Sequence, residues 1–531
     1  MKIFFRLVLT ILFAVPAFLQ AQDDNKNVEL PDFVITGVER VTIQNADKPK
    51  TEPVPILSKD FFKPVYSTEE LPVAELSNPI KKDIRLLSDE PLPEGTLTLA
   101  AGIYTMPAGS FSYNKNLSGF LFNGSVWGLN QREYDDHTEY NNSGLKLGAS
   151  FFPSAESGLF HGLQIDVSGR YNRESYRFFA SQTPDFLRNM HEGNLKLNFR
   201  NMLDEKFNYG LLFGDDIFYL KDRDLNENVF SLEGFTRNRF GSFEFNGNLQ
   251  YKNQTFEKKI SDGISGGSFF NLLTTVDYKL AENLKVGAGI MYASADSMHM
   301  FSPVASIAIR LSDQLSIFGS FKPEAHFMSL RDITLINRYY EPQQDYLFYK
   351  SKNKIEVAAR YEYETYFEIN AGMSYAKLGD YYYFTDTADR GFFSVNRTDG
   401  KQVTAFGNLL FHLGPYGKFY GGIAFNDTRD NNDKTLPYQP FLTGDLRYSY
   451  KFDFGLSAEA SVVFSSKAYT DSVNSRSIPG YFNAGGRLGY DIMKNFEIFT
   501  ELSNLFDNKN YLWRGYKQKP IDIAFGIQYR W

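Results

Sequence analysis

Runs in which every second residue is apolar recur from Thr96 to the last residue of the chain. Residues 521–531 show this pattern most strictly, with apolar side chains at Ile521, Ile523, Phe525, Ile527, Tyr529 and Trp531. Successive side chains of a β-strand point to opposite faces, so a period of two predicts strands with one apolar and one polar face. We therefore expect an all-β protein.

Ten short turns interrupt these runs and indicate how the strands connect. They fall near residues 116, 154, 204, 238, 281, 313, 365, 415, 453 and 494. Successive turns are 32 to 52 residues apart, which leaves room for two strands of about ten residues and one long polar loop. Short turns on one rim and long loops on the other are typical of an outer-membrane β-barrel, whereas soluble sandwiches turn roughly every 8 to 12 residues.

Closure of the barrel then gives the number of strands. If both ends of the sheet lie at the short-turn rim, ten turns give an antiparallel transmembrane barrel of 22 strands, within a range of 20–24. A barrel of this width encloses a lumen that wall side chains do not fill, so the lumen is either a channel or is plugged. Long loops are expected at residues 131–142, 174–192, 322–353, 385–401, 426–439 and 466–479.

The N-terminal residues 1–21 have the features of a cleaved signal peptide. Lys2 and Arg6 precede an apolar run at residues 7–18, and Ala21 is a small residue at a plausible cleavage point. The alternative, a membrane anchor, needs ~20 apolar residues, and this run is shorter. We expect export from the cytoplasm.

Residues 22–94 differ in composition from both flanking regions. They hold nine of the 21 prolines in the chain. Proline fixes φ and lacks a backbone donor, so we expect an extended or loosely ordered periplasmic or luminal segment rather than a packed domain. The barrel itself is predicted to occupy residues 95–531.

Three stretches resemble TonB-dependent outer-membrane receptors. The run ELSNLFD at Glu501–Asp507, with the alternating C-terminal strand, is similar to the closing hairpin of that family. Residues 322–357 are similar to its mid-barrel segment, and FVITG at residues 33–37 resembles a TonB box. The resemblance implies uptake of a bulky nutrient across the outer membrane of a bacterium.

The box-like stretch consists of Phe33, Val34, Ile35, Thr36 and Gly37. The resemblance implies that this stretch adds as a strand to a TonB-type periplasmic protein, with main-chain hydrogen bonds providing the affinity. Two alternatives remain open. The stretch is a chance match in a flexible tail, or it packs inside the barrel mouth.

The chain also departs from the family pattern. The family carries a plug domain of well over a hundred residues between the box and the barrel, but about 57 residues separate Gly37 from Gly95 here. We therefore expect a barrel without a plug of its own. The lumen is then filled by the proline-rich segment, by inward-folded loops, or by a separate plug or partner protein.

The terminal strand has a second predicted role. Phe525, Ile527, Tyr529 and Trp531 resemble the C-terminal aromatic signal that the barrel-assembly machinery recognises, although the family usually ends in Phe rather than Trp. The apolar face of this strand is expected to contact outer-membrane lipid, since closure pairs its backbone on both sides.

Aromatic residues crowd one predicted outer loop. They are Tyr339, Tyr340, Tyr346, Phe348 and Tyr349. Rigid aromatic side chains in an outer loop suit contact with a carbohydrate, a siderophore or a protein partner. The alternative is that the wall continues beyond the membrane and these residues cover its rim.

The sequence offers little for catalysis or for cofactors. The chain has no Cys, and its six His residues are not paired at the spacing of metal ligands. Asp427, Asp430 and Asp433 lie close together, but Arg429 and Lys434 interrupt the pattern of a calcium loop. Lys and Arg number 56 against 63 Asp and Glu, which argues against a nucleic-acid partner. We expect no catalytic residues, no metal site and no cofactor, and therefore no enzyme.

Two functions remain open on the sequence. The first is a barrel that resembles a TonB-dependent receptor and transports a bulky nutrient. The second is a structural or assembly barrel without a plug that binds other outer-membrane or periplasmic proteins.

Overall fold

The computed structural model describes residues 93–531 except 118, 154–161, 202–205, 258–265, 344–345, 364–366 and 413–416. The predicted signal peptide and the box-like stretch Phe33–Gly37 lie outside the described residues, as does nearly all of the proline-rich segment. No helix in the described part of the chain is long and apolar enough to cross a membrane.

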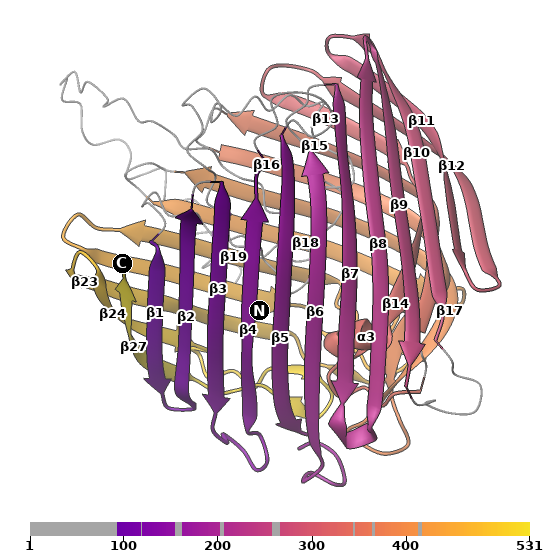
Figure 1. Cartoon of the computed structure of the whole chain (residues 1–531). Coiled ribbons are helices and arrows are strands. Elements are labelled where there is room, and N and C mark those ends of the chain that lie inside the picture. The colour runs from indigo at the N-terminus through magenta and orange to yellow at the C-terminus, as the bar shows by residue number, and fades with distance from the viewer. Residues whose placement is uncertain are drawn as a thin grey trace, which may run out of the picture. The chain divides into compact units, whose positions relative to one another are not determined.

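The wall of the barrel consists of antiparallel strands joined in chain order (Figure 1). Its first twelve strands are β1 (Gly95–Gly102), β2 (Thr105–Leu117), β3 (Phe120–Gln131), β4 (Tyr140–Phe151), β5 (Leu163–Arg177), β6 (Leu187–Asn201), β7 (Phe207–Leu220), β8 (Leu225–Phe240), β9 (Phe243–Phe256), β10 (Ser268–Ala281), β11 (Leu284–Ala295) and β12 (Met298–Arg310). The remaining wall strands are β13 (Leu315–Phe321), β14 (Glu324–Ser329), β15 (Tyr346–Tyr363), β16 (Phe367–Asp386), β17 (Phe393–His412), β18 (Lys418–Asp430), β19 (Leu442–Lys451), β20 (Leu456–Ser465), β23 (Tyr481–Met493), β24 (Phe496–Ser503) and β27 (Asp522–Arg530).

Shorter elements lie in the connections at the long-loop rim. They are the helices η2 (Lys221–Arg223) and α3 (Leu330–Ile336) and the hairpins β21 (Ala468–Tyr469) with β22 (Ser477–Ile478) and β25 (Tyr511–Trp513) with β26 (Tyr516–Lys517).

The sheet closes because β27 pairs with both β24 and β1. Strands β13 and β14 both pair with β15 and occupy one position of the ring, so the 23 strands of the sheet fill 22 positions. The predicted barrel of 22 strands is confirmed. Its two ends meet at the short-turn rim, where the N–H groups of Gly95 and Trp531 each donate to the other residue's carbonyl oxygen (3.0 and 3.1 Å).

Side chains on the two faces of the wall differ as the alternation predicts. The outward side chains of β1 and β27, among them Leu99, Phe525 and Ile527, are apolar and exposed. Many inward side chains are polar; Lys285 of β11, for example, lies 3.3 Å from Glu244 of β9 and 3.5 Å from Asp277 of β10. In lipid, apolar side chains face hydrocarbon at little cost, and the polar ones are kept in the lumen.

All ten predicted turns lie within three residues of a connection between strands. Several strands are longer than predicted and some loops are shorter, although β19 and β20 have ten residues and the loop expected at 466–479 lies at 466–480. Strands β16 and β17 each have 20 residues, and the loop expected at 385–401 is only 387–392. Their ladder continues through the pair Tyr383–Asn396 to the pair Asp386–Phe393. A strand needs only about ten residues to cross a membrane, so this part of the wall extends beyond the membrane.

Two prolines explain why β13 ends and β14 leaves the wall. Strands β12 and β13 pair as far as Ala305 with Phe321. Two residues further, the same register places Pro303 opposite Pro323. The backbone groups of successive residues in β12 point alternately towards β11 and towards β13. The N–H of Arg310 donates to Asn283, on the β11 side, so the backbone of Ala305, five residues away, faces β13. The next hydrogen-bonded pair would therefore join two residues that have no N–H, and the ladder stops there.

Asp522 ties the closing strand to the connection between β1 and β2. Its carboxylate accepts from the N–H of Tyr104 (3.0 Å), the hydroxyl of Thr105 (2.8 Å) and the ammonium of Lys519 (2.6 Å). Asp522→Ala removes all three bonds from a buried position. We expect the free energy of unfolding to fall by about 2–3 kcal/mol, measured by denaturant titration in lipid vesicles.

The matched control is Glu501→Ala on the neighbouring strand β24. Its side chain is more than half exposed, and its ion pair with Arg487 spans 3.6 Å. We expect a loss of no more than about 0.5 kcal/mol. Equal losses for the two variants would contradict a special role for Asp522 at the closing seam.

Candidate functional site at the loop-bearing mouth of the barrel

Loops from opposite sides of the barrel meet at the long-loop rim. The ring of Phe178, which follows β5, stacks on that of Phe392, which precedes β17, with centroids 4.7 Å apart. Strands β5 and β16, which begin these two loops, lie ten positions apart in the ring of 22. Loops that begin almost diametrically apart touch only if both reach across the lumen.

A cluster of buried side chains fills the space where these loops meet, and we call it the mouth cluster. Its members are Tyr176, Phe178, Met190, Phe218, Leu220, Leu225, Leu330, Ile333, Tyr339, Tyr340, Leu347, Phe384, Phe393, Val395 and Tyr516. They come from strands β5 to β8 and β15 to β17, from helix α3, from the hairpin β25–β26, and from the connections that follow β5 and α3. Such a cluster is an apolar core built across the lumen rather than within the wall.

Aromatic stacking holds the centre of this cluster together. The rings of Tyr339 and Tyr516 are nearly parallel, with centroids 3.4 Å apart. The hydroxyl of Tyr516 donates to the carbonyl oxygen of Gly391 at 2.5 Å. Burial raises the pKa of Tyr339 to about 12, with Arg338 opposing the shift, so this phenol stays neutral at physiological pH. A neutral aromatic pair is compatible with a closed apolar core.

Arg188 of β6 joins the cluster to its polar surroundings. Its side chain is fully buried, and Nε lies 3.2 Å from Asp222 of η2. Nη1 donates to the carbonyl oxygen of Tyr340 at 2.6 Å, and the guanidinium lies 4.7 Å from the centroid of the Phe178 ring. A buried charge is tolerated only when it is paired and hydrogen-bonded, so Arg188 fixes the segment after α3 against the opposite wall.

Helix α3 is fastened at its first turn. Ser329 and Asp332 form a reciprocal capping box. The buried carboxylate of Glu227 on β8 accepts from the N–H groups of Leu330 (2.9 Å) and Arg331 (2.8 Å). Arg331 in turn pairs with Glu192 of β6 at 3.0 Å. The segment that leaves the wall after β13 is therefore anchored to strands five and seven positions away.

The hairpin β25–β26 closes the mouth from a third side. The Trp513 ring packs against Tyr438, with centroids 4.7 Å apart, and against Phe393 at 5.2 Å. Asp386 accepts from the Tyr438 hydroxyl at 2.7 Å and pairs with Arg514 at 2.7 Å. Connections from three separate pairs of wall strands are thereby linked by direct contacts.

The five aromatic residues proposed as outer-loop contacts have a different environment from the one expected. Tyr346, Phe348 and Tyr349 lie in strand β15, so their predicted placement in a loop is wrong. Tyr340 and Phe348 are fully buried, Tyr339 and Tyr346 are nearly so, and Tyr349 is partly buried. The pairing of β14 with β15 draws these residues into the interior. A ligand contact at any of them stays a prediction.

Several residues of the mouth escaped the sequence reasoning. Arg188 and Glu227 lie in ordinary strand positions, and their partners in residues 330–340 are over a hundred residues away in sequence. The run Trp513–Tyr516 carried a usable signal, because two aromatic residues flank Arg-Gly, a turn in which Gly515 has a φ of 86°. Aromatic residues at the tip of a polar connection often mark a docking contact.

The lumen towards the short-turn rim is charged. Arg360 of β15 is buried and pairs with Glu362 and, at 3.2 Å, with Glu368. No group of His, Asp and Glu that could hold a metal occurs among the described residues. Asp427 pairs with Arg429 at 2.8 Å and Asp433 with Lys401 at 2.5 Å, so these carboxylates have cationic partners already.

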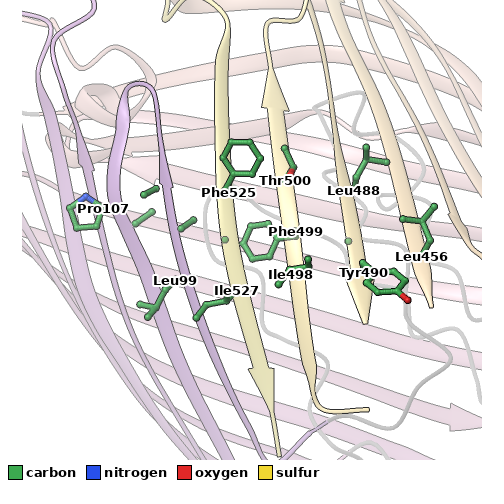
Figure 2. A pocket seen from close by; sticks show the side chains of 15 residues that line it. Leu99, Pro107, Leu456, Leu488, Tyr490, Ile498, Phe499, Thr500, Phe525 and Ile527 are labelled. Atoms are coloured by element: carbon green, nitrogen blue, oxygen red, sulfur yellow. The ribbon is translucent and has the colours of Figure 1, made fainter. Parts of the chain in front are cut away.

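An apolar groove lies outside the barrel at its closing seam (Figure 2). It has a volume of about 810 Å³ and runs over β1, β2, β20, β23, β24 and β27. Leu99, Leu488, Ile498, Phe525 and Ile527 line it, and their side chains are exposed. Two of the residues predicted to form the assembly signal thus lie on the outward apolar face, where lipid fills such a groove. Recognition by the assembly machinery stays a prediction.

Comparisons with known proteins agree on the fold. No protein-family model matches the chain, and no curated protein matches its sequence. Among solved structures, the siderophore receptor PiuA from Acinetobacter baumannii is 12% identical with a TM-score of 0.61, over 82% of this chain and 81% of PiuA. The FrpB iron transporter from Neisseria meningitidis is 10% identical with a TM-score of 0.62, over 83% and 82%. The copper transporter OprC is 10% identical with a TM-score of 0.59, over 83% and 81%. At these identities the likeness concerns the barrel fold alone.

The anchoring of α3 is tested by Glu227→Ala. The substitution leaves the N–H groups of Leu330 and Arg331 without their acceptor, which costs about 1–3 kcal/mol of local stability. Hydrogen exchange at these two amides should accelerate at least about tenfold.

Glu233→Ala provides a control on the same strand and the same face. Glu233 accepts from Gln250 at 2.8 Å and, within the described part of the chain, makes no hydrogen bond to α3. Exchange at α3 should change less than about twofold. If both variants left exchange unchanged, the carboxylate of Glu227 would not be the anchor.

Proposed function

We propose that this protein is an outer-membrane barrel of the TonB-dependent receptor type that takes up a bulky nutrient through a mouth closed by its own loops. The observation that carries the proposal is the contact between loops that begin on opposite sides of the ring, with Phe178 on Phe392 and Tyr339 on Tyr516. A wide barrel with a permanently open lumen would equilibrate the periplasm with the surroundings. Closure across the mouth fits a gated transporter better than a pore.

The contacts that close the mouth suit a reversible gate. They consist of aromatic packing, hydrogen bonds to carbonyl oxygens and a few ion pairs, with no covalent link, since the chain has no Cys. Each such contact contributes of the order of 1 kcal/mol, so a ligand that replaces several of them can shift the balance between closed and open states. The aromatic rings would then offer apolar surface to that ligand.

The nature of the nutrient follows by analogy with proteins of the same fold. The similar structures are a siderophore receptor, an iron transporter and a copper transporter. A metal carried by a bulky organic ligand is the corresponding proposal for this chain. The aromatic residues Tyr339, Tyr340, Tyr346, Phe348 and Tyr349 are its candidate contacts once the mouth has opened.

The N-terminal segment supplies the proposed link to an energy source. Phe33–Gly37 would add as a strand to a TonB-type periplasmic protein, because β-strand addition needs a short extended run with free backbone donors. The stretch between Gly37 and Gly95 is too short for the family's plug. The mouth cluster, or a separate plug or partner protein, takes over the role of blocking the lumen.

Planar-bilayer conductance tests the gate. The wild-type barrel should pass little steady current, because its loops meet across the lumen. The double substitution Tyr339→Ala/Tyr516→Ala removes the stacked pair and should raise the open probability at least about fivefold, which corresponds to roughly 1 kcal/mol.

Tyr278→Ala/Tyr490→Ala serves as the control, since both side chains are exposed on the outward face. Its conductance should match the wild type. A large steady wild-type current would contradict the gate. A silent barrel whose mouth variant also stays silent, and which copurifies with another envelope protein, would support the assembly function instead.

The role of the box-like stretch is tested separately with the full-length protein. Ile35→Pro removes a backbone donor and should lower the affinity for the periplasmic domain of a TonB-type protein at least tenfold, measured by calorimetry. Val65→Pro, in the same proline-rich segment, should leave binding unchanged. Equal affinity for both variants would show that residues 33–37 are not the binding strand.

A further inference from the structure

The wall of the barrel has one position without a continuous hydrogen-bond ladder. Strand β12 pairs with β11 over its whole length, from Met298 to Ile309. On its other side it pairs only from Ala305 to Arg310. Strand β14, which follows β13, pairs with β15 alone. Among the described residues, Met298–Val304 therefore have a strand partner on one edge only.

Side chains rather than backbone bonds close this position, and we call them the seam cluster. Its buried members are Phe269, Met291, Ala293, Ala295, Val304, Ala325, Phe327, Tyr346 and Phe348, and Leu273, Met298 and Met300 pack against them. They show that β14 and the start of β15 lie against the inward face of β10, β11 and β12. The wall overlaps itself here.

The composition of the seam cluster is distinctive. It includes three of the ten Met residues in the chain, Met291, Met298 and Met300. Methionine is unbranched and flexible, and it repacks around different neighbours at low cost. Apart from the Tyr346 hydroxyl, which donates to the carboxylate of Asp296 at the turn between β11 and β12, the other side chains of the cluster are apolar. One such bond specifies a geometry less strongly than a hydrogen-bond ladder does.

A junction closed by a hydrogen-bond ladder and one closed by side chains differ in the free energy needed to separate them within a membrane. Parting β11 from β12 would expose a full ladder of N–H and C=O groups to hydrocarbon, at several kcal/mol for each unsatisfied group. Parting β14 from β12 exposes mainly apolar side chains, and lipid tails can replace their contacts. The junction between β12 and β14 is therefore the one in the described wall that can part without breaking a backbone ladder.

The two sides of this junction face different surroundings. Outward, the free edge carries Phe301, whose side chain is 66% exposed, and Pro303. Inward, β14 continues directly into α3, which contributes Leu330 and Ile333 to the mouth cluster. A movement of β14 with α3 would thus affect the seam and the mouth together.

We propose that the wall opens laterally between β12 and β14 and that molecules bearing a hydrocarbon chain pass there between the lumen and the surrounding lipid. The inference rests on the proposed transport function and adds a substrate class to it. The polar part of such an amphipathic molecule travels through the charged lumen, while its chain replaces the apolar contacts of the seam. The two facing prolines, Pro303 and Pro323, prevent β12 and β14 from forming a continuous hydrogen-bond ladder.

Cysteine labelling tests the passage, since the chain has no Cys of its own. Ala325→Cys places a thiol in the seam cluster. Ala358→Cys places one at a comparably buried position of β15, where Phe318 of β13 and Gly372 of β16 pair on its two sides. The probe is a maleimide with a long acyl chain, mixed into the lipid of vesicles that hold the full-length protein.

We expect the lipid-borne maleimide to modify Ala325→Cys at least tenfold faster than Ala358→Cys, measured by mass spectrometry. Adding Pro303→Val and Pro323→Val restores two donors at the point where the ladder stops, and should slow the reaction at Ala325→Cys towards the control rate. If this variant fails to fold, the comparison of the two single-cysteine proteins decides alone.

Equal rates at the two thiols would overturn the proposal. So would a faster reaction of Ala325→Cys with a charged, water-soluble maleimide than with the lipid-borne one, because the thiol would then be reached from the aqueous lumen. These readouts do not depend on the conductance of the mouth. If Ala325→Cys is not labelled but the mouth is gated, the lateral passage fails and the proposed function stands. If Ala325→Cys is labelled but the mouth is not gated, the proposed function fails.

Discussion

Backbone hydrogen bonding in hydrocarbon is the constraint on which this structure depends. A strand edge that faces lipid leaves N–H and C=O groups without partners, so a sheet in a membrane has to close. Closure here rests on β27, which pairs with β24 on one side and with β1 on the other. The alternation of apolar and polar side chains, the even number of positions and the meeting of both ends at one rim all follow from that requirement.

Closure with 22 positions creates a second problem, since wall side chains do not fill a lumen of this width. The chain solves it with segments that leave the wall. After Pro323 the backbone departs from β12, pairs only with β15 and ends in α3, which is held by Glu227 of β8, five positions away in the ring. The same departure produces the mouth cluster and the overlapping seam. A single interruption of the ladder thus links the mouth cluster to the position of the wall that lacks a continuous ladder.

The sequence predicted the barrel well and the mouth poorly, for physical reasons. Turns and alternation are local signals, so ten turns gave the strand count. Strand ends beyond the membrane carry no such signal, and Tyr346, Phe348 and Tyr349 were placed in a loop although they belong to β15. The hydrogen bond from Arg188 to the carbonyl oxygen of Tyr340 joins residues 152 apart in sequence, and no local sequence pattern predicts such a contact. The crowding of aromatic residues in 339–349 is visible in the sequence, but exposed and buried aromatic residues look alike there.

The register of the closing pair has a kinetic consequence. Thr96 lies opposite Arg530, so the two residues are 434 positions apart in the chain. Contacts between strands so distant in sequence carry a large entropic cost of loop closure and form slowly. Until the closing pair forms, β1 presents an unpaired edge to every other nascent chain nearby, and an unpaired edge is a template for aggregation. The time during which that edge stays open, more than the stability of the finished barrel, determines how much this protein needs help to assemble.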